Sequence, residues 1–211
     1  MTLKYTPVCE FGKKIVDFSL SDFDGRNFSL SDCIGNNGTL IMFICNHCPY
    51  VKAIIKEIVK TSNEIRKFGI NSIAIMPNDY DKYEEDSPNN MLKFSKLYNF
   101  DFPYLVDKEQ IISKQFGAVC TPEFFGYNSN NELQYRGRLT ELNNLKVVNN
   151  KNELLDAMMQ IANNQIGPRI QFPSMGCSIK WRWFDFFECL EYFLIVLKYF
   201  PLIIWVTCIV W

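Results

Sequence analysis

The hydrophobic and polar positions of the chain alternate between strand-like and helix-like spacing. A continuous apolar run over residues 39–45 is typical of a strand buried on both faces of a sheet, and residues 70–76 are the next predicted strand. Between them, apolar residues recur at helical spacing from Val51 to Ile65, and Gly69 suits the C-terminal cap of that helix. The right-handed crossover rule predicts that the two strands are parallel.

Shorter patterns complete the predicted order of elements. Alternating runs over residues 17–20 and 27–30 flank an Asp-Gly turn and predict a hairpin. Ser87 and Pro88 supply the N-cap and first turn of a helix through Tyr98. The other predicted elements are a strand over 102–107, a helix over 109–117, an antiparallel hairpin of 123–127 and 133–139, and a helix over 152–163. This order predicts an α/β fold, a mixed sheet flanked by helices with an antiparallel edge.

Length, charge and the N-terminus narrow the class of protein. A chain of 211 residues, 48% of them hydrophobic, is long enough for one core and an extension. A formal net charge of −1 gives no field that would attract a polyanion, so nucleic acid is not an expected partner. The N-terminus lacks an apolar run of signal-peptide length, which predicts a cytoplasmic body whose eight cysteines are mostly reduced.

The last segment, residues 183–211, is far more apolar than the rest. From Tyr192 onward its only charge is Lys198, and about twenty residues would cross about 30 Å of hydrocarbon. Lys198 and Pro201 inside the segment count against insertion. Three alternatives stay open: membrane association through residues 184–211, an amphiphilic helix packed on the body, and a nonfunctional extension that tends to aggregate.

The segment from Cys45 to Pro49 carries the clearest chemical signal. It holds the only histidine, His47, between two cysteines in C-x-x-C spacing, with a proline directly after them. A helix that begins at Pro49 makes Cys48 its N-cap, where unpaired N–H groups and the helix dipole stabilise a thiolate. Cys48 is therefore the predicted nucleophile. Cys45 reaches it only if the intervening loop turns back on itself.

Other readings of the same residues stay open. His47 could lower the pKa of the thiol, relay a proton, or be an ordinary loop histidine. The two cysteines could be buried thiols without chemistry. Pro122 precedes a strand, where either a trans or a cis bond to Thr121 is acceptable, and Cys120 could be a plain buried residue.

Several segments together resemble a known family. The chain resembles thioredoxin-fold proteins of the redoxin class, and most closely the peroxiredoxin-like branch of the alkyl hydroperoxide reductase and thiol-specific antioxidant family. The segments are "DFSLSDFDG", "MFICNHCPYVK", "NDYDKYEEDSPNNM", "FPYLVDKEQIISKQFGAVCTPEFFGY", "YRGRL" and "GCSIKW". The resemblance implies a thioredoxin-like domain over residues 12–182, with the tail at 183–211 outside the family's pattern. It also implies that Thr121-Pro122 is a cis-proline turn that binds an extended substrate beside Cys48, with Cys120 nearby.

The chain also departs from both family patterns. Thioredoxins have a second cysteine three residues after the nucleophile, and here that position is Val51. Peroxiredoxins have a threonine where this chain has Cys45, and an arginine-containing strand where it has "TPEFF". Fast peroxide turnover is therefore not expected.

The favoured hypothesis is a thiol-dependent oxidoreductase or antioxidant enzyme. The Cys48 thiolate would attack a disulfide or hydroperoxide, and Cys45, or Cys120, would resolve it, with His47 as an auxiliary group. Its partner would be a thiol or disulfide protein or a small-molecule reductant, and no cofactor is expected. The alternatives are a metal-binding module that uses Cys45, Cys48, Cys120 and His47, and a noncatalytic adaptor held at a membrane by its tail.

Overall fold

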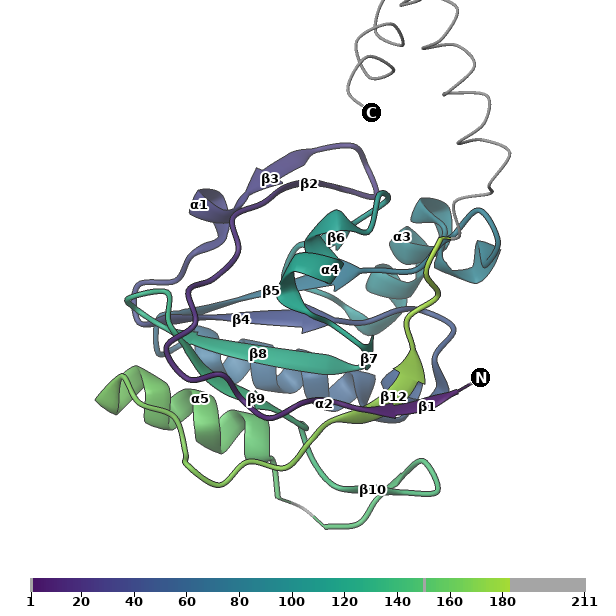
Figure 1. The fold of residues 1–211 in the computed structure, drawn as a ribbon. Coiled ribbons are helices and arrows are strands. Elements are labelled where there is room, and N and C mark those ends of the chain that lie inside the picture. Colours follow the sequence, from purple (N-terminus) through teal and green to yellow (C-terminus); the bar gives the residue numbers. More distant parts are fainter. Residues whose placement is uncertain (1, 150, 183–211) are drawn as a thin grey trace, which may run out of the picture. The chain divides into compact units, whose positions relative to one another are not determined.

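The computed structural model describes residues 2–149 and 151–182, and its main feature is a seven-stranded mixed sheet. The strand order is β3-β2-β6-β5-β4-β8-β9 (Figure 1). The strands are β2 Ser19–Asp22, β3 Asn27–Ser29, β4 Gly38–Phe43, β5 Ile70–Met76, β6 Tyr104–Val106, β8 Glu123–Asn128 and β9 Leu133–Gly137. The predicted mixed sheet flanked by helices, with an antiparallel edge formed by β8 and β9, is confirmed.

The two central strands are β4 and β5, which pair in parallel as predicted. Side chains of β4 alternate between the two faces, with Leu40 and Met42 in one core cluster and Ile41 and Phe43 in the other. Strand β4 ends at Phe43 rather than at residue 45, because the chain there already turns toward the next helix. Cys45 therefore lies in a loop and not in the strand.

Helices cover both faces of the sheet. The helices α2 Pro49–Arg66, α3 Pro88–Tyr98 and α5 Glu153–Asn164 pack on one face (Figure 1). The short helices α1 Leu30–Cys33 and α4 Ile111–Phe116 contribute to the core on the other face. The predicted starts of α2 and α3, with Cys48 and Ser87 as N-caps, are confirmed. Helix α2 ends at Arg66, and Gly69 with its φ of 75° belongs to the turn that follows.

A second, three-stranded sheet was not predicted from the sequence. Its order is β1-β12-β7, all antiparallel, from β1 Leu3–Tyr5, β12 Met175–Ser178 and β7 Cys120–Thr121. These strands have two to four residues and carry no alternating pattern that would reveal them. The remaining elements are a 3-10 helix η1 Glu84–Asp86 and a small hairpin of β10 Leu142–Asn143 and β11 Lys146–Val147. The second sheet brings the two ends of the described chain beside the turn that precedes β8.

The predicted hydrophobic tail at residues 183–211 lies outside the described residues. Within residues 2–149 and 151–182, no helix combines the length and the apolar composition needed to cross a membrane.

Candidate active site

The site is built at the junction of β4 and α2. Residues 44–47 turn the chain after β4, and Cys48 is the N-cap of α2 with Pro49 in the first turn. The carbonyl of Cys48 accepts the first helical hydrogen bond, from Lys52 N at 3.0 Å. Pro49 has no N–H to lose in this position, so the sequence places the sulfur of Cys48 at the positive end of an 18-residue helix.

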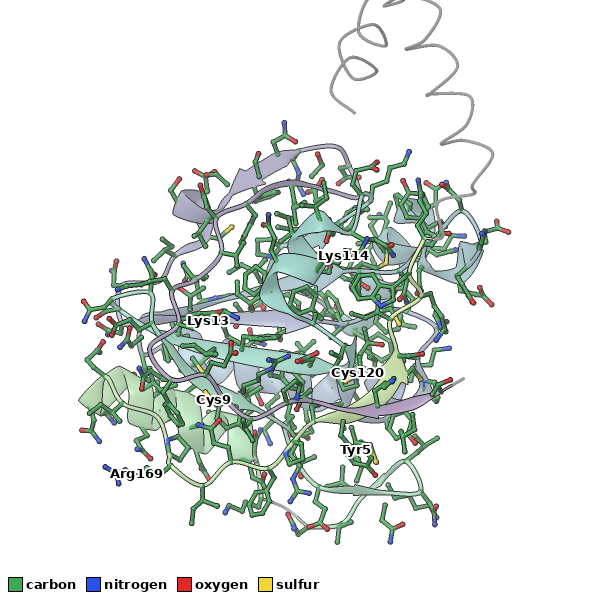
Figure 2. All side chains as sticks on the ribbon, viewed as in Figure 1. Tyr5, Cys9, Lys13, Lys114, Cys120 and Arg169 are labelled. Atoms are coloured by element: carbon green, nitrogen blue, oxygen red, sulfur yellow. The ribbon has the colours of Figure 1, made fainter. Side chains whose placement is uncertain are left out.

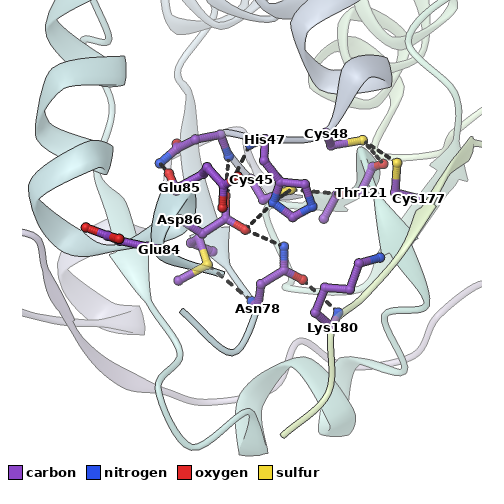
Figure 3. Close-up of polar contacts among 12 residues, drawn as sticks. Cys45, His47, Cys48, Asn78, Glu84, Glu85, Asp86, Thr121, Cys177 and Lys180 are labelled. Carbon is purple, nitrogen blue, oxygen red and sulfur yellow. Dashed lines mark hydrogen bonds and ion pairs between the residues drawn. The ribbon is translucent and has the colours of Figure 1, made fainter. Parts of the chain in front are cut away.

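The turn at Thr121-Pro122 lies beside this sulfur. The Thr121-Pro122 bond is cis, as the resemblance implied. The Cys48 Sγ lies 3.1 Å from the carbonyl oxygen of Thr121, in hydrogen-bonding geometry (Figure 3). Two segments 73 positions apart in the chain therefore meet at the nucleophile proposed from the sequence.

A third segment supplies a thiol that sequence reasoning missed. Cys177 of β12 lies with its Sγ 3.1 Å from the Sγ of Cys48, across 129 positions of sequence (Figure 3). The hydrogen bond between these thiols is the largest cause that lowers the pKa of Cys48, and it raises the pKa of Cys177. Burial opposes ionisation of Cys48, while the Val51 N–H in the first helical turn favours it although it falls short of full hydrogen-bond geometry. Cys48 is therefore the more acidic thiol of the pair, and in its neutral form it donates to the carbonyl of Thr121 and to Cys177 Sγ.

The other two thiols named from the sequence differ in their surroundings. Cys45 Sγ is completely buried, lies 3.3 Å from Thr121 Oγ1, and contributes to the low pKa of Cys48. Burial is the largest cause that raises the pKa of Cys45 well above its usual value. Cys120, the first residue of β7 (labelled in Figure 2), has its Sγ 3.8 Å from the carbonyl oxygen of Pro122, and burial raises its pKa as well. The six cysteines of the described residues form no disulfide with one another.

His47 is held by a buried carboxylate. Its Nδ1 lies 2.6 Å from Oδ2 of Asp86, and its ring stacks on Tyr83 with the centroids 5.7 Å apart (Figure 3). The hydrogen bond with Asp86 is the largest cause that raises the pKa of His47. The second ring nitrogen, Nε2, is buried without a hydrogen-bond partner. His47 is therefore not an ordinary surface histidine of a loop, because only 10% of its side chain is exposed.

Asp86 also fixes the shape of the loop before α2. Its Oδ1 accepts the backbone N–H groups of Asn46 at 2.8 Å and His47 at 3.2 Å. Its Oδ2 accepts Asn78 Nδ2 at 2.7 Å, and Oδ1 of Asn78 in turn accepts the N–H of Lys180 at 2.8 Å. One carboxylate thus connects the loop that precedes Cys48 with the segment that follows Cys177.

A possible metal-ligand cluster differs from the one considered from the sequence. Ligand atoms of Cys45, His47 and Asp86 lie within 4.8 Å of one another. Cys48 and Cys120, which the metal hypothesis needs, are outside this group. The His47 Nδ1 that would bind an ion is already engaged by Asp86, so the arrangement supports a hydrogen-bonded pair more directly than a metal site.

A cavity of about 490 Å³ opens beside His47. It is lined by Thr2, His47, Tyr83, Glu85, Ser178 and Lys180. Cys48 itself is completely buried and Cys177 is only 3% exposed, because β12 lies over the nucleophile. A substrate that reaches Cys48 must therefore displace part of this cover.

Comparison with known proteins identifies the family. A model of the AhpC/TSA family matches residues 11–140, which is more than half of the chain. The chain belongs to the AhpC/TSA family. Membership in this family, together with the thioredoxin-like fold, gives the protein a general thiol-dependent redox role. A comparison with curated proteins found no significant match.

Solved structures share the fold of this chain. An uncharacterized conserved protein from Geobacillus kaustophilus is 34% identical, with a TM-score of 0.81 over 88% of this chain and 99% of that one. A hypothetical protein from Sinorhizobium meliloti 1021 is 30% identical, with a TM-score of 0.78 over 84% and 98% of the two chains. A putative thiol:disulfide interchange protein DsbE from Chlorobium tepidum shares the fold at 16% identity, with a TM-score of 0.54 over 74% and 99%.

Proposed function

We propose that this AhpC/TSA-family protein is a thiol–disulfide oxidoreductase in which the Cys48 thiolate attacks a substrate disulfide. The observation that carries the proposal is the position of Cys48 Sγ, at the N-cap of α2 and 3.1 Å from the backbone carbonyl of Thr121. A thiolate at a helix N-terminus is the reactive form in disulfide exchange. The backbone of Thr121-Pro122 would then align an extended substrate segment beside the sulfur.

A disulfide is favoured over a hydroperoxide by the groups around the sulfur. Peroxide cleavage needs donors that polarise the O–O bond, but the groups that act on Cys48 Sγ are a carbonyl oxygen, thiols and the backbone N–H groups of Val51 and Cys177, with no arginine among them. Arg136 does not supply such a donor, because its guanidinium is bound by Glu123 at 2.6 Å and by the carbonyl of Gly117 at 2.7 Å. Hydroperoxides therefore remain the second substrate class in this proposal.

Cys45 and Cys120 are the resolving thiols named from the sequence. Cys45 contributes to the low pKa of Cys48, whereas the Sγ of Cys120 lies 3.8 Å from the Pro122 carbonyl. His47, held by Asp86, carries a raised pKa and would be a proton donor to the thiolate that leaves the substrate.

The test compares two buried cysteines. Reduced full-length protein and its Cys48→Ser and Cys33→Ser variants are assayed for reduction of a protein disulfide and, separately, of an organic hydroperoxide, each with a dithiol reductant. Cys33 is a matched control because it is buried in the opposite core cluster. We expect Cys48→Ser to abolish disulfide reduction and Cys33→Ser to retain it. Full activity of Cys48→Ser would disprove the proposal, and faster consumption of hydroperoxide than of disulfide would reverse the substrate order.

A further inference from the structure

Cys177 lies on a strand that is fixed in register beside the nucleophile. In β12, Cys177 pairs with Thr121 of β7 on one side and with Leu3 of β1 on the other. The next residue, Ser178, pairs with Cys120 and donates its N–H to the carbonyl of Thr2 at 2.9 Å. The backbone of Cys177 is therefore held between two strands, and the side chain reaches Cys48 from that frame.

Contacts at both ends of β12 keep this register. Before the strand, Ser174 donates its hydroxyl to the carbonyl of Pro122 at 2.7 Å and its N–H to Thr6 Oγ1 at 2.9 Å. After the strand, the N–H of Lys180 donates to Asn78 Oδ1 at 2.8 Å. The residue next to Cys177 is Gly176, where an added Cβ would collide with the carbonyl of Thr121. The close approach of β12 to the cis-proline turn thus depends on a glycine and on polar anchors at either end.

The three thiols near Cys48 are not equivalent in this arrangement. Cys177 Sγ is 3.1 Å from Cys48 Sγ and comes from a different segment of the chain. Cys45 lies in the same loop as Cys48, and its Sγ is engaged by Thr121 Oγ1 at 3.3 Å. Cys120 Sγ contacts the carbonyl of Pro122 at 3.8 Å. Lys180 follows Cys177 closely and its charge favours ionisation of that thiol once Cys48 no longer carries a negative charge.

We propose that Cys177 is the resolving thiol, and that the active dithiol of this protein is Cys48–Cys177 instead of the C-x-x-C pair Cys45–Cys48. This inference rests on the proposed function of Cys48. A segment near the end of the domain would then complete the site, and β12 would stay paired with Thr121 whenever no substrate segment is there.

Reduction of the substrate takes two thiol–disulfide exchange steps. The Cys48 thiolate attacks one sulfur of a substrate disulfide, forms a Cys48–substrate bond, and releases the other substrate sulfur as a thiolate. Cys177 then loses its proton and attacks Cys48 Sγ, which forms the Cys48–Cys177 disulfide and releases the second substrate sulfur. Two electrons pass from the protein to the substrate. An external dithiol, of a reductant protein or a small molecule, returns them and regenerates both cysteines.

Disulfide mapping tests this pairing directly. Reduced full-length protein is treated with a limiting amount of oxidised glutathione, free thiols are blocked by alkylation in acid, and the peptides are identified by mass spectrometry. We expect a Cys48–Cys177 linkage to predominate. A predominant Cys45–Cys48 or Cys48–Cys120 linkage would overturn the assignment, and this result stands without any variant that has to fold.

Trapping of the mixed disulfide separates this inference from the proposed function. In Cys177→Ser, the glutathione adduct on Cys48 should persist, whereas in wild type and in Cys33→Ser it should give way to the internal disulfide. If the adduct on Cys177→Ser disappears as fast as in wild type, Cys177 is not the resolving thiol although Cys48 is still the nucleophile. If wild type never forms an adduct or disulfide at Cys48, the proposed function fails as well.

Discussion

The Nδ1 atom of His47 lies 2.6 Å from Oδ2 of Asp86, and the Asp86 side chain is completely buried. A buried carboxylate is costly unless it is paired and fully hydrogen-bonded. Here the carboxylate hydrogen-bonds with His47 Nδ1 and accepts hydrogen bonds from two N–H groups of the loop that leads to Cys48. The pair therefore connects the protonation of the single histidine with the shape of the loop beside the nucleophile.

Removal of this carboxylate should lower the pKa of His47. In wild type, the hydrogen bond with Asp86 raises that pKa above 6.5. We expect Asp86→Asn to bring it down, and Glu84→Gln, an exposed neighbour on the same segment, to leave it unchanged. Because the chain has one histidine, a pH titration of the imidazole proton resonance by NMR reports this residue alone. An unchanged His47 pKa in Asp86→Asn would contradict the pairing.

The same pair should make stability depend on pH. A histidine whose pKa is raised in the folded state contributes stability that is complete below its unfolded value of 6.5 and is lost as pH rises through the folded pKa. The free energy of unfolding of wild type, measured in urea, should therefore fall over that interval relative to His47→Gln. Parallel pH curves for the two proteins would count against this contribution.

Cys177 should tune the thiolate of Cys48. The hydrogen bond between Cys48 and Cys177 is the largest cause that lowers the pKa of Cys48, so Cys177→Ala should raise that pKa toward its ordinary value. The measurement is the ultraviolet absorbance of thiolate against pH, taken as the difference between each protein and the same protein with Cys48→Ser. Cys33→Ser serves as the control that should leave the Cys48 titration in place. A Cys48 titration that is identical with and without Cys177 would refute this role.

Much of the fold could be predicted because local patterns coincide with the elements. The buried strand β4 and the N-caps Cys48 and Ser87 follow from an apolar run and from prolines at the first helical position. The contribution of β12 could not be predicted, because residues 175–178 form a short segment of mostly small residues with no alternation of apolar and polar positions. Their pairing partners are equally short strands at distant positions, and only tertiary contacts select them.

The role of Asp86 in the site could not be predicted from the sequence either. It is the last of three consecutive acidic residues, and such a run usually predicts a solvated surface. Glu84 and Glu85 are exposed, whereas Asp86 is turned inward by η1 and meets His47 across 39 positions of sequence. The sequence identified His47 and Cys48 by their adjacency, but no local signal marked the partners that tune them.

Gly176 should be required for the close approach of β12. A methyl group there would meet the carbonyl of Thr121, so Gly176→Ala should push the strand outward and cost about 1–3 kcal/mol of stability. Gly176→Ala should also slow formation of the Cys48–Cys177 disulfide, although it changes neither cysteine. Denaturant unfolding and quenched oxidation measure the two effects, with Met175→Leu in the same strand as a volume-conserving control. Wild-type closure kinetics in a folded Gly176→Ala protein would contradict the expected contact.

The buried pair of Glu123 and Arg136 should support the turn that bears Pro122. Glu123 Oε1 accepts two guanidinium hydrogen bonds, at 2.9 and 2.6 Å, while its Oε2 accepts the N–H of Val119 at 2.7 Å. Arg136→Met would leave a buried carboxylate unpaired, at a cost of about 3–5 kcal/mol. Because burial already raises the pKa of Glu123, this cost should grow as pH rises above the ordinary value of 4.5.

An exposed pair provides the comparison for that ion pair. Lys14 lies 3.0 Å from Glu132 with two thirds of its side chain exposed, so Lys14→Met should change stability by less than about 1 kcal/mol. Urea unfolding of both variants at several pH values gives the two results together. Similar losses of stability in Arg136→Met and Lys14→Met would mean that burial of the Glu123–Arg136 pair does not increase its contribution to stability.

Oxidation should stabilise the protein if the disulfide forms between Cys48 and Cys177. This bond would close a loop between residues 129 positions apart, which in the chain-entropy model stabilises the folded state by up to about 5 kcal/mol. A Cys45–Cys48 bond closes only a tight local loop, and the loop term shrinks with the logarithm of its length. Calorimetry of oxidised and reduced wild type should therefore differ in Tm by roughly 10 °C. The same comparison in Cys177→Ser should give almost no difference, and a large rise that persists in that variant would assign the stabilising disulfide to another pair.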